Sequence, residues 1–566
     1  MSTMRVVTVL LLALLFLIPM QGSGQNIVRV PPWIGTNFLN NFIMGDTLAN
    51  GQRRDSNAVY VLQRGKVYAA NAPMRNIGWT LRLAANDTTG NVSKPIVYLY
   101  PGGTQQLPPG QFVDMRGNAT MKNVILTGYF EPDSTKVAGL QGQLFQTSTA
   151  GWSLTLDSCI LTNTNGNHVR TNSAPKLIKI TNCIFANMGY LGTSNLGAGK
   201  GIDLRAGSAD SVIIVNNTFV NWQDRVIRHF ASTAAIGFLK FEHNTCVNGM
   251  SYHGFLSLGH TGSRVIIRDN LLVDPFALGQ DTDAVRQAEF TDSGEKDSFG
   301  FPRMTWVISN QDPATWWTVA NNYYRITPDG QAFFDYASVN PIIANPPLVA
   351  GSPLTYHINR QLGADSAIAF RTHTADLPKV PKLMTEMMKW YRLPQSALPD
   401  SGAGKTKATS MFRAKFDYDR RRLEYYRDTL DCAYSTSDPV YTAGTGGYPV
   451  GDLNWFPTRK AAWLNDAVSS AEEPPGVPTE FSLSQNYPNP FNPSTRIEFS
   501  LAQPAKVSLT VVDILGRQVA TVIDAESRGV GKHVATFSSS GLATGVYFYR
   551  LTAGEKTVTM KMMILK

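Results

Sequence analysis

Three short segments with alternating polar and apolar residues each carry an arginine directly after an apolar residue. The arginines are Arg170 in NHVRT, Arg205 in GIDLRA and Arg228 in DRVIRHF. A guanidinium binds a carboxylate through two parallel hydrogen bonds, so a row of arginines suits the carboxylates of an acidic polymer. Asp203 and Asp224 stand in the same segments and could pair with the arginines instead. The residues therefore leave two interpretations open, an anion-binding stripe and an internal Arg/Asp ladder.

The chemistry that such a stripe would support is β-elimination from a uronate. This reaction requires a cation beside the carboxylate, so that the neighbouring C–H becomes acidic, and a base that removes the proton. The candidates for these catalytic roles are the basic residues in or next to the arginine segments, namely Arg228, Arg205, Lys200 and His229. The candidates for substrate binding are their charged neighbours, Arg170, Arg225, Asp203 and Asp224.

Other chemistries have weaker support. A glycoside hydrolase needs paired carboxylates, and HGFLSLG (253–259) is one residue too long for the polygalacturonase phrase HGxSxG. We therefore interpret His253 and His260 as turn or surface residues. Calcium requires clustered carboxylates, and Asp269 belongs to a bend rather than to an arginine segment, so a Ca²⁺ cofactor stays open. The sequence contains no P-loop, dinucleotide fingerprint or zinc-ligand spacing.

A repeated eight-residue phrase must position these side chains. Its copies are LDSCILTN from Leu156, ITNCIFAN from Ile180, IVNNTFVN from Ile214, FEHNTCVN from Phe241, IRDNLLVD from Ile267 and VANNYYRI from Val319. Alternating apolar residues predict a strand with one buried face, and the polar pair that follows predicts a bend. The first five copies start 24, 34, 27 and 26 residues apart, which is typical of a solenoid. The arginine segments then form a second strand in each coil, about 4.8 Å from the next coil.

The fourth position of the phrase changes from cysteine to asparagine along the chain. Cys159 and Cys183 occupy it in the first two copies, and the later copies have Asn217, Asn244, Asn270 and Asn322. We expect one inward column, with amides that hydrogen-bond along the stack. We also expect two stacked thiols, because a disulfide between parallel neighbours in register would be strained. With four cysteines in an exported chain, disulfides do not make the fold.

The phrase and its asparagine bends resemble the pectate-lyase-like superfamily of right-handed parallel β-helices, over residues 40–460. The resemblance implies an all-β fold, a right-handed parallel β-helix followed by a small sandwich. It does not select an activity, because β-helices also serve as hydrolases, esterases, adhesins and epimerases.

From residue 481 the pattern changes to short alternating strands of a small Ig-like β-sandwich. The phrases QNYPNPFNPSTRIEFSL (485–501), VVDILGRQV (511–519), GVYFYRL (545–551) and the terminal KMMILK resemble the C-terminal sorting domain of type IX secretion substrates. The resemblance implies that the type IX secretion machinery is a partner. It also implies export across an outer membrane, to the cell surface or the medium.

These patterns divide the chain into six parts. Arg5 and the apolar run from Val6 to Ile18 predict a secretory signal, and no later segment is apolar over the length of a membrane helix. The expected parts are 1–25 signal peptide, 26–115 N-terminal cap and first coils, 116–340 parallel β-helix, 341–470 C-terminal cap and wrap-back region, 471–480 linker, and 481–566 sorting domain.

Charge and composition narrow the class of partner. The 566-residue chain has a formal charge of +9 but only 16% charged residues, which excludes a nucleic-acid-binding tail. The charge fits either a mildly basic surface or an anionic partner such as an acidic polysaccharide. The leading hypothesis is a secreted or surface-attached carbohydrate-active protein, a polysaccharide lyase that cleaves acidic polysaccharide by β-elimination. The alternative is a non-catalytic glycan-binding or adhesive surface protein.

Overall fold

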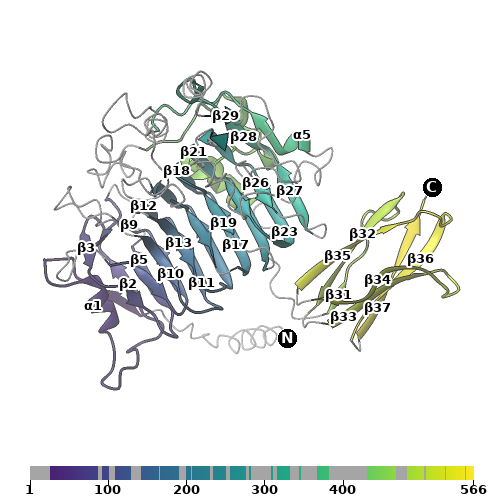
Figure 1. Ribbon diagram of the computed structural model, residues 1–566, viewed down its shortest axis with the longest axis horizontal. Coiled ribbons are helices and arrows are strands. Elements are labelled where there is room, and N and C mark those ends of the chain that lie inside the picture. The colour runs from purple at the N-terminus through teal and green to yellow at the C-terminus, as the bar shows by residue number, and fades with distance from the viewer. Residues whose placement is uncertain are drawn as a thin grey trace, which may run out of the picture.

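The chain folds as a stack of coils with three strands in each coil (Figure 1). In one coil, β11 (Ser153–Asp157) leads through a bend to β12 (Ile160–Thr164), and a second bend leads to β13 (Asn167–Thr171). The chain then returns to β14 (Leu177–Thr181), which pairs with β11 in parallel. The prediction of a right-handed parallel β-helix followed by an antiparallel β region is confirmed.

The computed structural model describes a defined part of the chain. The described residues are 26–86, 92–100, 109–128, 142–164, 166–189, 199–205, 207–229, 234–249, 255–275, 280–281, 307–309, 315–331, 343–345, 366–380, 430–466, 481–501, 505–528, 531–554 and 556–565. The expected signal peptide, the expected linker at 471–480 and His253 lie outside these residues.

Three parallel sheets form the walls of the β-helix. Sheet 1 contains β1 (Ile27–Arg29), β2 (Val59–Leu62), β5 (Leu81–Ala85), β8 (Ala119–Lys122), β11, β14, β17 (Ala209–Val215), β20 (Ile236–Glu242), β23 (Thr261–Arg268) and β27 (Trp316–Ala320). Sheet 2 contains β3 (Val67–Ala70), β6 (Ile96–Leu99), β9 (Ile125–Thr127), β12, β15 (Ile184–Met188), β18 (Thr218–Trp222), β21 (Thr245–Gly249), β24 (Leu271–Pro275), β28 (Asn322–Arg325) and β30 (Phe370–Thr372).

Sheet 3 carries the arginine segments. It contains β4 (Met74–Arg75), β7 (Val113–Met115), β10 (Gln143–Thr147), β13, β16 (Ile202–Leu204), β19 (Ile227–His229), β22 (Leu256–Leu258) and β26 (Val307–Ser309). A short antiparallel pair, β25 (Gln280–Asp281) and β29 (Ile343–Asn345), lies outside the three sheets. Strands from residues 26–115 already belong to the stack, so the parallel pairing begins well before the clear copies of the phrase.

The bends depend on residues that tolerate a left-handed backbone. From β8 onward, the bend residue after each sheet 1 strand has a φ between 51° and 60° and is Asn123, Ser158, Asn182, Asn216, His243, Asp269 or Asn321. Asparagine and aspartate adopt this conformation more readily than other non-glycine residues because their short polar side chains bond locally. The polar pair of the phrase therefore makes the bend that its composition predicts.

The asparagine column is present and faces inward. Asn217 Nδ2 donates to Asn244 Oδ1 at 3.0 Å, Asn244 Nδ2 to Asn270 Oδ1 at 3.1 Å, and Asn270 Nδ2 to Asn322 Oδ1 at 2.8 Å. Cys159 and Cys183 continue the same column as free, buried thiols. From Cys159 to Asn322, one side chain at the same bend of each coil therefore makes a hydrogen bond to the next coil.

Helices and a returning segment cover parts of the β-helix. Helix α1 (Leu39–Met44) buries Leu39 and Ile43 in the main core at the N-terminal end, and α5 (Ser366–Ala369) precedes β30. Residues 430–466, which we call the strap, contain η4 (Pro439–Tyr441), η5 (Thr445–Gly447), η6 (Leu453–Trp455) and α9 (Pro457–Asn465). The strap falls within the region expected to wrap back.

The strap packs on the outer faces of two sheets. Its Val440 and Val450 share an apolar cluster with Val220 and Val247 of sheet 2. Its Leu453 joins a second cluster on sheet 1. Each buried aliphatic side chain contributes roughly 1.5–3 kcal/mol, so this packing holds the strap without continuing the repeat.

The C-terminal residues form a separate antiparallel sandwich (Figure 1). One sheet contains β31 (Ser482–Leu483), β32 (Ser494–Leu501) and β35 (Gly531–Ser538). The other contains β34 (Gln518–Arg528), β33 (Ala505–Val512), β36 (Gly545–Ala553) and β37 (Lys556–Ile564). The sandwich has its own core, built around Ile497, Leu509 and Tyr549.

Candidate functional site

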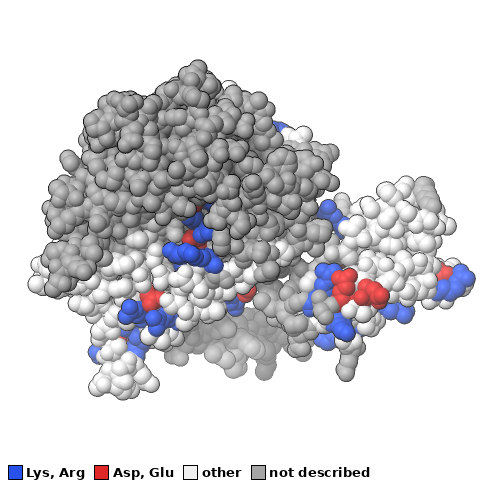
Figure 2. Space-filling model, in the orientation of Figure 1, with Lys and Arg blue, Asp and Glu red and all other residues white. Residues whose placement is uncertain are grey.

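Side chains along each strand of sheet 3 point alternately into the core and outward. Successive side chains of a strand point to opposite faces. The core side contains Val169, Ile202, Ile227 and Leu256, which pair in register along the sheet. The outward side contains Arg170, Asp203, Arg228 and Ser257, which pair in the same way. Figure 2 shows basic and acidic side chains gathered on the face where Figure 1 labels β10 and β13.

The prediction that Arg170, Arg205 and Arg228 occupy successive rungs is wrong for Arg205. Ile202 pairs with Val169, so Asp203 takes the arginine position in the middle coil. Arg205 follows the end of β16, is exposed, and donates its backbone N–H to the Asp203 carbonyl at 3.0 Å. Three stacked arginines would repel one another, whereas a carboxylate between two guanidiniums attracts both of them.

Asp203 is the centre of the outward column. Its Oδ1 accepts from Arg228 Nη1 at 3.2 Å, and its Oδ2 accepts from Asn167 Nδ2 at 3.2 Å. Arg170 Nε lies 3.9 Å from Oδ2. The Asp203 side chain is 2% exposed, whereas the side chain of Arg170 is 26% exposed. One buried carboxylate therefore holds two arginines at the edge of the solvent.

Arg170 has incomplete charge compensation. Partial burial lowers the pKa of Arg170. The attraction of Asp203 opposes this effect, and the repulsion of Arg205 and Arg228 adds to it. A bound anion next to Arg170 would stabilise the charged form of its guanidinium.

Lys200 and its neighbours form a more buried group in the next coil. Lys200 Nζ lies 2.8 Å from Asp224 Oδ2, and Arg225 Nε lies 3.6 Å from Asp224 Oδ1. All three side chains are nearly inaccessible. Burial lowers the pKa of Lys200, and the attraction of Asp224 and Asp203 opposes that shift. Lys200, Asp224 and Arg225 therefore form a set of internal ion pairs.

Gly199, directly before Lys200, occupies a position where a side chain would not fit. Gly199 has a φ of +83°, and a Cβ there would lie 2.4 Å from the Met188 carbonyl oxygen. The Lys200 N–H donates to Asn167 Oδ1 at 3.1 Å. The backbone of Gly199 and Lys200 therefore lies close against the preceding coil, and the Lys200 side chain contacts Asp224 rather than solvent.

His229 belongs to the core side of sheet 3. It pairs with Leu204 and Leu258, which are both core residues, and it is 2% exposed. Its Nε2 is in hydrogen-bonding contact with the Gly207 carbonyl oxygen, and burial lowers its pKa to about 4. Sequence reasoning grouped His229 with Arg228 because the two are adjacent, but adjacent strand residues face opposite sides.

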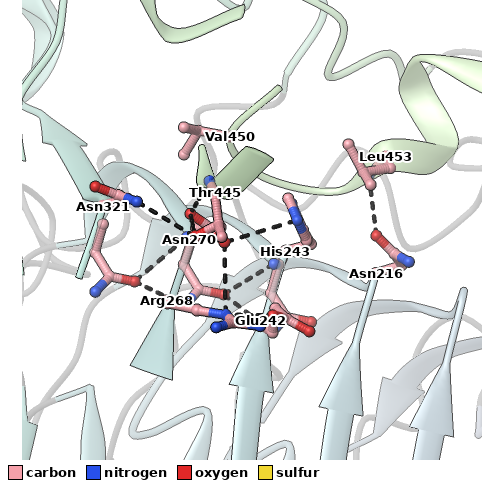
Figure 3. A network of polar contacts seen from close by, with 12 residues as sticks. Asn216, Glu242, His243, Arg268, Asn270, Asn321, Thr445, Val450 and Leu453 are labelled. Carbon is pink, nitrogen blue, oxygen red and sulfur yellow. Dashed lines mark hydrogen bonds and ion pairs between the residues drawn. The ribbon is translucent and has the colours of Figure 1, made fainter. Parts of the chain in front are cut away.

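A second polar network lies where the strap meets sheet 1 (Figure 3). Asp269 Oδ1 accepts from the Thr445 N–H at 2.9 Å and from Thr445 Oγ1 at 3.1 Å. Arg268 Nε donates to Glu242 Oε1, and His243 Nε2 lies 3.8 Å from Asp269 Oδ2. Asp269 is in a bend, as expected. The two hydrogen bonds from Thr445 to Asp269 anchor the strap to sheet 1.

Sequence reasoning missed a further charged group on sheet 3. Arg75, Asp114 and Arg116 lie together near the N-terminal end of the sheet. The segment FVDMRG (112–117) has the same alternation as the arginine segments, which was the available signal. It was overlooked because the repeated phrase is not clear before residue 116.

The described ranges contain neither a metal-binding cluster nor a membrane-spanning helix. No three His, Cys, Asp or Glu side chains there come close enough to share an ion. No helix in the same ranges is both long and apolar enough to cross a membrane.

Comparison with known proteins identifies the C-terminal sandwich. No curated protein and no solved structure matches the chain. Residues 485–565 match the family model described as a secretion system C-terminal sorting domain. The resemblance of the tail is therefore confirmed, and the protein is exported by the type IX secretion system to the cell surface or the medium.

Proposed function

We propose that the exported β-helix binds acidic polysaccharide through the outward face of sheet 3. The carrying observation is the position of Arg170 and Arg205. Arg205 is exposed and Arg170 is one-quarter exposed, and both lie beside a buried Asp203 that already holds Arg228. A uronate carboxylate placed between Arg170 and Arg205 would form bidentate hydrogen bonds and offset their mutual repulsion.

Binding is favoured over cleavage by the surroundings of the expected catalytic residues. His229 lies on the core side of the sheet, away from a polymer on the outward face. Lys200 is engaged with Asp224 at 2.8 Å. A base must reach the proton that it removes, within hydrogen-bonding distance. We therefore assign the leading role to recognition of the carboxylates.

The binding test compares polymers and arginine variants of the mature protein. We expect retention on immobilised polygalacturonate or alginate but not on neutral dextran. Arg170→Ala/Arg205→Ala should weaken the binding at least tenfold, a loss of about 1.4 kcal/mol, and added salt should weaken the binding of the unaltered protein. Arg29→Ala removes an exposed arginine of sheet 1 and is the matched control. Equal retention of the double variant would contradict the proposal.

A uronate lyase is the second candidate, and Lys200 favours it. Its lowered pKa increases the fraction of neutral amine, which is the form that acts as a base. The ion pair with Asp224 would have to open when substrate binds. Incubation with polyuronates should then release unsaturated ends that absorb ultraviolet light, and Lys200→Met should abolish this product. Retention of the polymer without any product would exclude the lyase and leave the binding function.

A further inference from the structure

Arg75, Asp114 and Arg116 repeat the composition of the first charged group, with two arginines at one buried carboxylate. Asp114 Oδ2 accepts from Arg75 Nε at 3.3 Å and from Arg116 Nη2 at 3.2 Å. Ser148 Oγ donates to the other oxygen, Oδ1. The Asp114 side chain is 5% exposed, whereas those of Arg75 and Arg116 are 56% and 38% exposed. Again one buried carboxylate holds two guanidiniums that reach solvent.

The two groups belong to one outward column. Arg75 pairs with Asp114, Asp114 with Gln146, and Gln146 with Arg170. Three strand spacings therefore separate Arg75 from Arg170, about 14 Å along the sheet. The described part of Figure 2 shows charged side chains in separate groups on this face rather than in one continuous patch. Cationic positions thus recur along the direction in which the coils stack.

We propose that Arg75 and Arg116 form a second carboxylate-binding subsite, so that one polyuronate chain lies along the column and contacts both arginine groups. This inference rests on the proposed binding function. It adds the direction in which the polyuronate lies on the sheet and the minimum length of an oligomer that binds both groups. Only an oligomer that covers about 14 Å reaches both groups.

Charge density favours a polyuronate over a sulfated glycan. Asp114 neutralises one of its two arginines, so this group has a formal surplus of one positive charge. A polyuronate carries one carboxylate on each uronate sugar, which suits the single surplus charge of this group. The uncharged Gln146 lies between the groups and can hydrogen-bond to sugar hydroxyls.

The test measures the dependence of affinity on oligomer length. Isothermal titration with oligogalacturonates from disaccharide to octasaccharide should show at least a tenfold gain for the mature protein once the chain spans both groups. Arg75→Gln/Arg116→Gln should remove that gain while leaving disaccharide binding unchanged. Because the double variant leaves Asp114 with fewer partners, Arg75→Gln alone is a second variant in which Arg116 still pairs with it. Arg29→Ala is the surface control.

The outcomes separate the two proposals. If the Arg75 and Arg116 variants keep the full length dependence while Arg170→Ala/Arg205→Ala loses binding, the second subsite is wrong and the proposed function stands. If the unaltered protein binds no oligogalacturonate, the proposed function and this inference both fail. Tighter binding of a heparin oligosaccharide than of an oligogalacturonate of equal length would overturn the choice of a polyuronate.

Discussion

At the scale of single residues, Asn244 shows how strongly the coils depend on one side chain. Its Nδ2 donates to the Ile214 carbonyl at 3.0 Å and to Asn270 Oδ1 at 3.1 Å. Its Oδ1 accepts from the backbone N–H of Asn217 at 3.1 Å and from Asn217 Nδ2 at 3.0 Å. The residue is fully buried. Loss of this amide would leave polar groups in two neighbouring coils without partners.

We expect Asn244→Ala to lower the free energy of unfolding by about 3 kcal/mol or more, because each unsatisfied buried polar group costs about 1–3 kcal/mol. Urea unfolding followed by circular dichroism measures the change. Asn57→Ala, at an exposed turn, is the control and should change the free energy by less than about 0.5 kcal/mol. A similarly small effect of Asn244→Ala would contradict the importance of the ladder.

At the scale of elements, Asp452 joins the strap to the β-helix. Its Oδ2 accepts from Thr218 Oγ1 at 2.7 Å, and its Oδ1 accepts from the Asn454 N–H at 2.9 Å. Burial raises the pKa of Asp452 from 3.8 to about 7, although these hydrogen bonds and Lys460 oppose the shift. The other titratable groups nearby are the buried thiols of Cys246 and Cys432. The strap is thus attached through a carboxyl group that favours its protonated form.

We expect this attachment to weaken as the pH rises from about 4 to about 7. In that window the folded state keeps a proton that the unfolded state has lost, so the free energy of unfolding falls by about 1.4 kcal/mol for each pH unit. Asp452→Asn should flatten this dependence and increase stability at pH 8. Denaturant unfolding at pH 5 and pH 8 measures both effects. A pH dependence that is the same in both proteins would rule out Asp452 as its source.

At the scale of the whole molecule, the β-helix and the sorting domain have separate hydrophobic cores. A domain with its own core folds independently when its linker is cut. We therefore expect deletion of residues 481–566 to leave the β-helix folded. The far-ultraviolet circular dichroism signal per strand residue should stay unchanged. The same deletion should keep the protein inside the producing cell, because residues 485–565 carry the export signal.

Fractionation of the producing cells and thermal unfolding of both forms measure these outcomes. The full chain should show one more unfolding transition than the truncated chain. Export of the truncated chain would contradict the assignment of the tail. Aggregation of the truncated chain would show instead that the β-helix needs the sandwich for stability.

Local sequence patterns were enough to predict the strands, the bends and the sorting domain of this protein. Apolar residues spaced two apart define strands, and asparagine at a bend tolerates a positive φ, so both can be recognised without knowing any distant contact. The inward ladder at Asn217 and Asn244 followed from the same position in each copy. The sequence motifs of the tail likewise identified the sorting domain, because the match depends on contiguous residues.

Tertiary structure decided which charged residues face one another. Arg170 and Arg228 stand at equal offsets from the start of their copies and occupy the same column, but Arg205 follows a longer loop, and its apolar–arginine pattern did not give it the same position on the sheet. The register placed Asp203, rather than Arg205, between Arg170 and Arg228. It also brought Asp114 into the same column.

The sequence could not predict the contacts of the strap either. Thr218 and Asp269 lie about two hundred residues before the strap residues that they contact. Such pairings arise from the free energy of stacking whole coils and of packing the strap against them. Strand alternation and bend chemistry are properties of a few neighbouring residues, whereas register is a property of the assembled stack.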